Sequence, residues 1–170
     1  GGEGVERAGE GNAVALTTTV NTYYGSGLLT SKTGIVLNDE MDDFALAPNQ
    51  PNAFGLVQSN YNLVGPGKRP LSSMTPTLLM DGDKVVGCVG GSGGPRIISG
   101  TLQVLLSALV FGDDAGQAVA RPRLHHQWQP DEVRIETSWA EDRTLGGLWA
   151  RGHTLVPYPK YVGVVQAMFE

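Results

Sequence analysis

Short apolar runs along the chain predict strands separated by turns. Val, Thr and Ala dominate residues 12–20, which predicts a strand buried on at least one face. Similar runs predict strands at residues 34–37, 77–80, 84–89, 133–136 and 161–169. Residues 1–11 are rich in glycine and show no alternation, so we expect a loop or a disordered segment there. Residues 47–68 are rich in Pro, Asn and Gly and predict a long ordered loop or lid.

Apolar residues at helical spacing follow Pro95, and proline fits the first turn of a helix. The apolar face of this helix would hold Ile98, Leu102, Leu105, Leu106 and Leu109. A second helix is expected to begin at Asp113 or Asp114 and to end before Pro122. The capping-box pattern at residues 138–141 predicts a third, ending at Gly152. Strands, two central helices and further strands predict an α+β domain, built as a two-sheet sandwich covered by helices.

Composition narrows the classes of partner. The 170 residues are 41% hydrophobic, which suits one domain with a core of its own. The net charge of −5 argues against a nucleic-acid groove, which needs clustered Lys and Arg. No apolar run approaches the roughly 18 residues of a membrane span. We therefore expect no nucleic-acid partner and no membrane span in this chain.

A glycine-rich loop, residues 90–96, joins the predicted strand at 84–89 to the following helix. Unpaired N–H groups and the positive dipole end at the start of a helix favour an anion. The loop lacks the Gly-Lys-Ser/Thr ending of a P-loop, and no βαβ unit with a suitable acidic residue follows it. Two interpretations remain: a site for a phosphate, a carboxylate or a reaction oxyanion, or a merely structural turn.

Four carboxylates occur within residues 39–43. Glu40, Asp42 and Asp43 would bind a metal, cradle an organic cation or form a solvated face. No His, Cys and Asp spacing in the chain matches a zinc pattern, and we expect neither a metal nor a cofactor.

Ser72 and Ser73 form a hydroxyl pair just before the predicted strand at 77–80. Serines commonly cap turns. Beside Lys68 and Arg69, however, the pair would also suit a carboxylate ligand.

Together these segments resemble the small, C-terminal subunit of the γ-glutamyltransferases, also called γ-glutamyltranspeptidases or glutathione hydrolases. The resemblance covers residues 12 to about 156, and the run KRPLSSM is particularly specific. The matching segments are residues 17–22 (TTTVNT), 25–27 (GSG), 34–38 (GIVLN), 41–44 (MDDF), 65–77, 93–98 and 122–128 (PRLHHQW).

The resemblance implies the N-terminal-nucleophile fold, an αββα sandwich of mainly antiparallel sheets, of which this chain holds part. It implies a precursor that cleaves itself, after which the N-terminal threonine of the small subunit attacks a γ-glutamyl amide with its own amine as base. The expected donor is a γ-glutamyl peptide such as glutathione, and the expected partner is the large N-terminal subunit of the same precursor. The family implies a periplasmic or extracellular location.

Carried over residue by residue, the resemblance makes Gly93 and Gly94 the backbone donors of an oxyanion hole. Thr19 matches the threonine that orients the nucleophile. The α-ammonium group of the substrate would be held by Asn21, Glu40 and Asp43, and its α-carboxylate by Ser72 and Ser73.

Both ends of the chain depart from the family pattern. Counting back from residues 11–12 puts Gly1 at the nucleophile position, where threonine is expected, and residues 1–11 form an atypical glycine-rich start. Residues 12–170 form the small-subunit domain without the family's last strand. We therefore expect this chain to be inactive by itself. The alternative is an inactive homologue or fragment that binds γ-glutamyl ligands, glutamate or a partner subunit.

Overall fold

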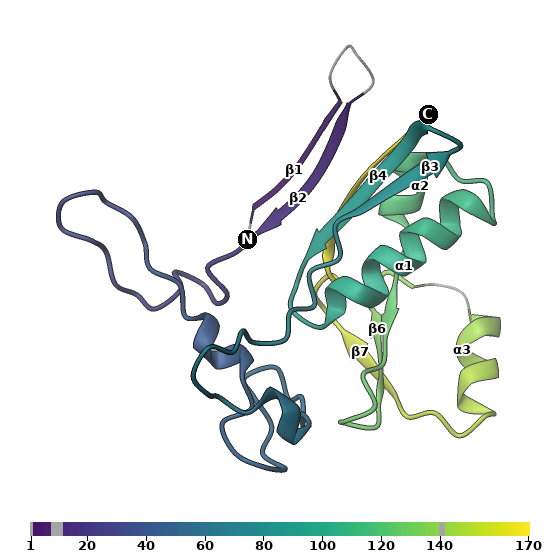
Figure 1. The fold of residues 1–170 in the computed structure, drawn as a ribbon. Helices are drawn as coiled ribbons and strands as arrows, with labels where there is room; N and C mark the ends of the chain where they lie inside the picture. Colours follow the sequence, from purple (N-terminus) through teal and green to yellow (C-terminus); the bar gives the residue numbers. More distant parts are fainter. Residues whose placement is uncertain (1, 8–11, 140–141) are drawn as a thin grey trace. The chain divides into compact units, whose positions relative to one another are not determined.

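The computed structural model describes residues 2–7, 12–139 and 142–170 (Figure 1). The chain divides into two compact units. The smaller unit holds residues 18–72 together with Gly2, and the larger holds residues 3–17 and 73–170. Each unit is described by itself.

The smaller unit is built mainly of turns. It contains two 3-10 helices, η1 (Glu40–Asp43) and η2 (Asn60–Asn62). Phe44 and Ala45, directly after η1, are buried and anchor it. The strand expected at residues 34–37 is reduced to one bridge, Leu29 to Val36, because turns follow closely on both sides. The long loop expected at residues 47–68 is present.

The larger unit contains an antiparallel sheet in the order β3-β4-β8 (Figure 1). Its strands are β3 (Thr77–Asp81), β4 (Lys84–Ser92) and β8 (Val164–Phe169). A tight turn at Gly82 joins β3 to β4, as the sequence predicts. β4 extends three residues further than predicted, into the glycine-rich stretch, because β8 pairs with it as far as Ser92.

Two helices, α1 (Arg96–Leu109) and α2 (Ala115–Ala120), pack on this sheet. The core between them is formed by Val89, Val104, Ala118 and Val165. α2 begins with a capping box in which the Asp114 side chain accepts from the N–H of Gln117. Neither α1 nor any other helix of the described ranges combines the length and apolar character that crossing a membrane requires.

The buried face of α1 differs from the predicted one. The helix buries Ile97, Gly100, Thr101, Val104 and Ser107. Four of the five residues of the predicted face are exposed: Ile98, Leu102, Leu106 and Leu109. The small residues face inward because a backbone turn lies against them: a Cβ atom added to Gly100 would be 2.8 Å from the carbonyl oxygen of Val162.

Gly100→Ala is expected to destabilise the chain by about 1–3 kcal/mol, because overlap with a backbone oxygen outweighs the gain in helix propensity of about 1 kcal/mol. Gly146→Ala in helix α3 (Asp142–Trp149) is the matched control, since a Cβ atom there meets nothing within 4 Å. That variant should gain about 0.5–1 kcal/mol. Urea unfolding measures both, and equal effects of the two variants would contradict the packing described here.

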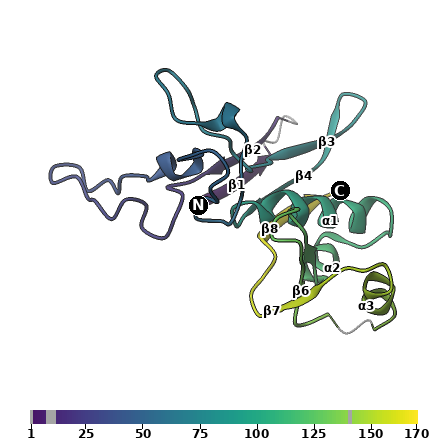
Figure 2. The same cartoon turned by 90° about the horizontal axis from the view of Figure 1, so that it is seen from below.

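A second, mixed sheet of the larger unit has the order β5-β6-β7. It consists of β5 (Leu124–His125), β6 (Val133–Glu136) and β7 (Leu155–Tyr158). β6 has the predicted bounds, whereas β7 was not predicted; it lies parallel to β6 and contacts α3 (Figure 2). Residues 140–141 of the predicted capping box lie outside the described residues, and α3 ends before the positive-φ residue Gly152, as predicted.

A two-stranded sheet is formed by β1 (Gly2–Arg7) and β2 (Ala13–Thr18). β2 confirms a strand within residues 12–20, but the predicted burial of one face is wrong, because its residues alternate between half-buried and exposed. The loop predicted for residues 1–11 is wrong for residues 2–7, which form a strand. The physical reason is that hydrogen bonding to β2 stabilises an extended backbone in this segment, although its glycine-rich composition does not favour a strand.

Candidate functional site

Helix η1 carries two of the carboxylates that the sequence assigns to substrate binding. Glu40 and Asp43 are half-buried at its two ends, whereas Asp42 between them is exposed. Phe44 fixes the end of η1 by its burial, and the carbonyl oxygen of Asp43 accepts from Nδ2 of Asn62 at 2.8 Å. The position of Asp43 is therefore fixed by both packing and hydrogen bonding.

The turn at residues 19–22 is hydrogen-bonded to the start of the same acidic segment. Asn21 adopts φ 72°, a left-handed conformation that asparagine tolerates, and its N–H donates to Oγ1 of Thr19 at 2.8 Å. Nδ2 of Asn21 donates to the carbonyl oxygen of Asp39, and the N–H of Thr22 donates to Oδ1 of Asp39 at 3.1 Å. Asp39 thus joins the turn to η1.

The sequence analysis did not single out Asp39. The hydroxyl of Thr22 donates to this carboxylate and lowers its pKa below the usual range. Asp39 therefore stays ionised and has a structural task. Asp39 stands at the N-cap of η1, but its side chain binds Thr22 and does not cap the helix.

The predicted cation-binding residues Asn21, Glu40 and Asp43 come together in the smaller unit. Burial raises the pKa of Glu40, and the negative charge of Asp43 and a hydrogen bond with it raise it further. Burial also raises the pKa of Asp43, opposed by hydrogen bonds from Glu40 and Asn21. Among the described residues, none donates a hydrogen bond to the buried Oε1 of Glu40. A cationic donor would satisfy that oxygen and offset the repulsion.

Asp43→Asn is expected to lower the pKa of Glu40, because a negative neighbour is removed, but not to its ordinary value, since burial remains. A carboxyl with a raised folded-state pKa makes the chain more stable as the pH falls through that pKa toward the unfolded-state value. The gain in unfolding free energy on acidification from neutral pH toward the ordinary pKa of a glutamate should therefore be smaller in the variant. Carbon NMR titration and urea unfolding measure the two effects.

Asp42→Asn serves as the control for this titration, because Asp42 is not among the charges that shift Glu40. An unchanged pKa of Glu40 in Asp43→Asn would contradict the coupling of the two carboxyls.

The glycine loop lies in the larger unit, between β4 and α1. Gly93 and Gly94 both have positive φ, 139° and 62°, so the loop has a conformation that L side chains rarely adopt. Pro95 caps α1, and the N–H of Ile97 donates to the carbonyl oxygen of Gly94 at 3.0 Å. Within the described part of the chain, no acceptor is recorded for the N–H groups of Gly93 and Gly94. They are available to an anion at the start of a helix.

The two serines differ in setting. Ser72 is exposed and belongs to the smaller unit, whereas Ser73 is half-buried and belongs to the larger. Lys68 does not stand free beside them: its Nζ donates to the carbonyl oxygens of Tyr61 and Leu63 at 2.8 and 2.9 Å. Lys68 therefore closes the turn around η2, and its expected part in a carboxylate site is not supported.

Gly1, the expected nucleophile position, lies outside the described residues. Across the described ranges, no group of three or more His, Cys, Asp or Glu side chains has a metal-binding arrangement. Within the described residues, the three residues predicted to bind a cation therefore lie together in the smaller unit, and the glycine loop lies in the larger.

Comparisons with known proteins identify relatives of this chain. A family model described as Gamma-glutamyltranspeptidase matches residues 7–170. The glutathione hydrolase proenzyme of Escherichia coli strain K12 is 46% identical over 143 residues, which are 84% of this chain and 24% of that protein. The glutathione hydrolase proenzyme of Pseudomonas sp. strain A14 is 46% identical over 127 residues, 75% of this chain and 22% of that protein. The chain spans about a quarter of the length of these curated relatives.

A solved structure of this family also has the fold of this chain. A mutant of the Helicobacter pylori gamma-glutamyltranspeptidase superposes with a TM-score of 0.93 at 40% identity, over 98% of this chain and 89% of that one. The α+β N-terminal-nucleophile hydrolase fold expected from the sequence is thereby confirmed. From the match over residues 7–170 and this superposition, the chain belongs to the γ-glutamyltranspeptidase family.

Proposed function

We propose that this chain supplies the substrate-binding and oxyanion-binding groups of a γ-glutamyl amide hydrolase and transferase. The observation that carries this proposal is the half-buried pair Glu40 and Asp43 with Asn21 beside it, in which one buried carboxylate oxygen has no donor among the residues that the structure describes. The α-ammonium group of a γ-glutamyl compound is a cation with three N–H donors and suits this set.

The glycine loop serves the reaction step. A threonine hydroxyl at position 1 would attack the γ-carbonyl carbon while the α-amine of the same residue takes its proton. The carbonyl oxygen then becomes negative, and the N–H groups of Gly93 and Gly94 stabilise it. The intermediate collapses when the amine of the substrate's amide leaves with the proton that the α-amine of residue 1 had taken. The γ-glutamyl group, now an ester of the threonine, is then transferred to water or to an acceptor amine. Gly1 lacks the hydroxyl that begins this sequence.

The remaining roles follow from the resemblance. Thr19, whose Oγ1 accepts from the N–H of Asn21, would orient the nucleophile. Ser72 and Ser73 would bind the α-carboxylate, together with groups of the large subunit. The relatives in Escherichia coli and Pseudomonas are named glutathione hydrolase proenzymes. The word proenzyme supports a large subunit from the same precursor as partner, and the word glutathione supports that compound as donor.

The experiment compares two isomeric substrates. The chain carrying Gly1→Thr at a free N-terminus is combined with the large subunit of a family member, and anilide release is measured from γ-glutamyl and α-glutamyl anilides. We expect release from the γ-isomer at least tenfold faster, because the family resemblance implies a γ-glutamyl donor. Equal rates would contradict the proposed substrate class.

A binding measurement tests the alternative of an inactive homologue. Calorimetry of the unchanged chain with glutamate should show binding that weakens in Asp43→Ala. Binding in the unchanged chain, combined with no release by the Gly1→Thr assembly, would favour the binding protein over the enzyme.

A further inference from the structure

The turn Val162–Gly163 packs directly against the glycine loop. A Cβ atom added to Gly93 would be 3.0 Å from Cα of Gly163. A Cβ atom added to Gly163 would be 3.2 Å from the carbonyl oxygen of Arg96 and 3.4 Å from that of Ser92. These distances place Gly163, whose φ is 71°, against both ends of the loop that carries the two N–H groups. A shift of this turn would therefore press on the loop.

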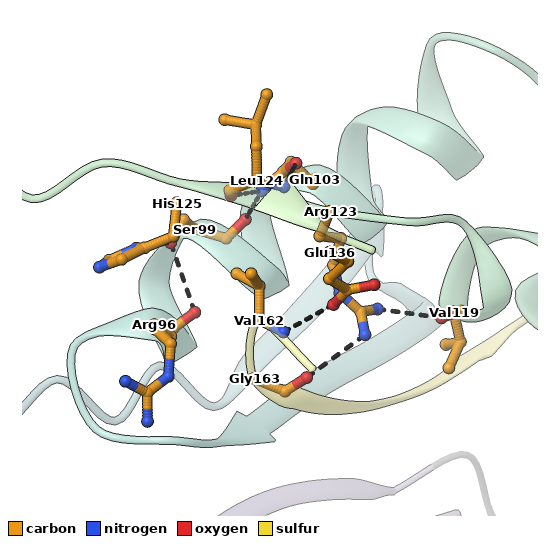
Figure 3. Close-up of polar contacts among 10 residues, drawn as sticks. All are labelled: Arg96, Ser99, Gln103, Val119, Arg123, Leu124, His125, Glu136, Val162 and Gly163. Carbon is orange, nitrogen blue, oxygen red and sulfur yellow. Dashed lines mark hydrogen bonds and ion pairs between the residues drawn. The ribbon is translucent and has the colours of Figure 1, made fainter. Parts of the chain in front are cut away.

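A buried ion pair holds the turn in place (Figure 3). Oε1 of Glu136 accepts from the N–H of Val162 at 2.6 Å, and Nη2 of Arg123 donates to the carbonyl oxygen of Gly163 at 3.3 Å. Nε of Arg123 lies 3.5 Å from Oε1 of Glu136, and Nη1 donates to the carbonyl oxygen of Val119 at 2.9 Å. The side chains of both charged residues are only 5% exposed.

The cost of this arrangement indicates a specific task. Removing two charges from water carries a desolvation penalty that an apolar pair of the same size avoids. In return, bonds to charged groups fix the geometry of a backbone turn more strictly than neutral ones. Arg123 directly precedes β5 and Glu136 ends β6, so the pair ties the second sheet to the turn that enters β8. The turn therefore has defined partners on both its N–H and its carbonyl side.

We propose that Arg123 and Glu136 are positioning residues for the oxyanion loop and act through the Val162–Gly163 turn. The inference rests on the proposed function, because it assigns the N–H groups of Gly93 and Gly94 to the reaction oxyanion. The pair touches neither substrate nor reacting atoms. It keeps the two donors at the place where negative charge develops, and a displacement of about 1 Å there reduces a rate by roughly 10²-fold.

Three substitutions separate positioning from general stability. Glu136→Gln keeps an oxygen for the N–H of Val162 but removes the charge that pairs with Arg123. Arg123→Lys keeps the charge but loses the fork that reaches two carbonyl oxygens. Glu132→Gln is the matched control, since it breaks the ion pair with Arg134 next to the same strand, away from the turn.

The first measurement is NMR on the full chain, with the amide resonances of Gly93 and Gly94 as the readout. We expect them to shift in Glu136→Gln and in Arg123→Lys and to stay unchanged in Glu132→Gln. If one of the two variants fails to fold, the other decides the result. Resonances of Gly93 and Gly94 that remain in place while that of Gly163 moves would overturn the proposal.

The second measurement is steady-state kinetics of the Gly1→Thr assembly with a γ-glutamyl anilide, per folded molecule. Glu136→Gln should lower kcat at least tenfold with KM within about twofold, because the loop acts on the transition state. An unchanged kcat, or an equal loss in Glu132→Gln, would overturn the positioning role. Absence of turnover in the parent assembly, with the NMR shifts still local to the loop, would overturn the proposed function and leave only the structural link between the ion pair and the loop supported.

Discussion

With Gly1→Thr at a free N-terminus and a family large subunit present, the chain is expected to hydrolyse a γ-glutamyl anilide at least about 10³-fold faster than the unchanged sequence. The reason is chemical: glycine has no hydroxyl, whereas an N-terminal threonine supplies both the nucleophile and the amine that takes its proton. Removing a nucleophile leaves only the rate that binding and oxyanion groups provide. Chromophore release measures the difference.

Gly1→Ala is the control for this comparison, because it adds a Cβ atom without a hydroxyl. It should behave as the unchanged chain does, and Gly1→Ser should recover part of the rate. Turnover by the unchanged sequence equal to that of Gly1→Thr would show that the nucleophile lies elsewhere in the assembly.

Asp43→Ala in the same assembly is expected to lower kcat/KM for the γ-glutamyl donor by about 30-fold or more. The estimate follows from the roughly 2–5 kcal/mol lost when one partner of a hydrogen-bonded charge pair is truncated. Most of the loss should fall on KM, because the α-ammonium group is held alike in the ground state and the transition state. Initial rates over a range of donor concentrations separate the two parameters.

Asp42→Ala removes the same charge one position earlier, from a side chain that is exposed, and should change kcat/KM less than threefold. Equal losses in the two variants would mean that net negative charge, and not the position of Asp43, determines donor binding.

Sequence reasoning succeeded where local chemistry decides structure. The hairpin around Gly82, the helix after Pro95 and the capping box at Asp114 each depend on a few adjacent residues, and all three are present. It also grouped Asn21 with Glu40 and Asp43. Asn21 is at least 19 positions from either carboxylate, and the three residues nevertheless come together. That grouping came from the resemblance, since nothing in the spacing brings these residues into contact.

Sequence reasoning failed where pairing or packing with another segment decides the structure. The strand at residues 2–7 exists because β2 pairs with it, and β7 exists because β6 does. The buried face of α1 is the one with Gly100 and Thr101, because only small side chains leave room for the turn at Val162. Hydrophobic periodicity selects the most apolar face of a helix and contains no information about the shape of what packs on it.

The sequence by itself therefore determined the family and the α+β class, because these depend on residue types at defined positions. It also supplied the proposed cation-binding and oxyanion-binding groups. It also determined that position 1 carries no hydroxyl. Only the tertiary structure decided that Glu40 keeps a buried oxygen with no donor within the described part of the chain, and that Arg123 and Glu136 hold the turn that packs on Gly93. Burial and hydrogen-bond geometry arise from segments that meet only in the folded chain, and the pKa of a carboxyl or the position of a loop follows from them.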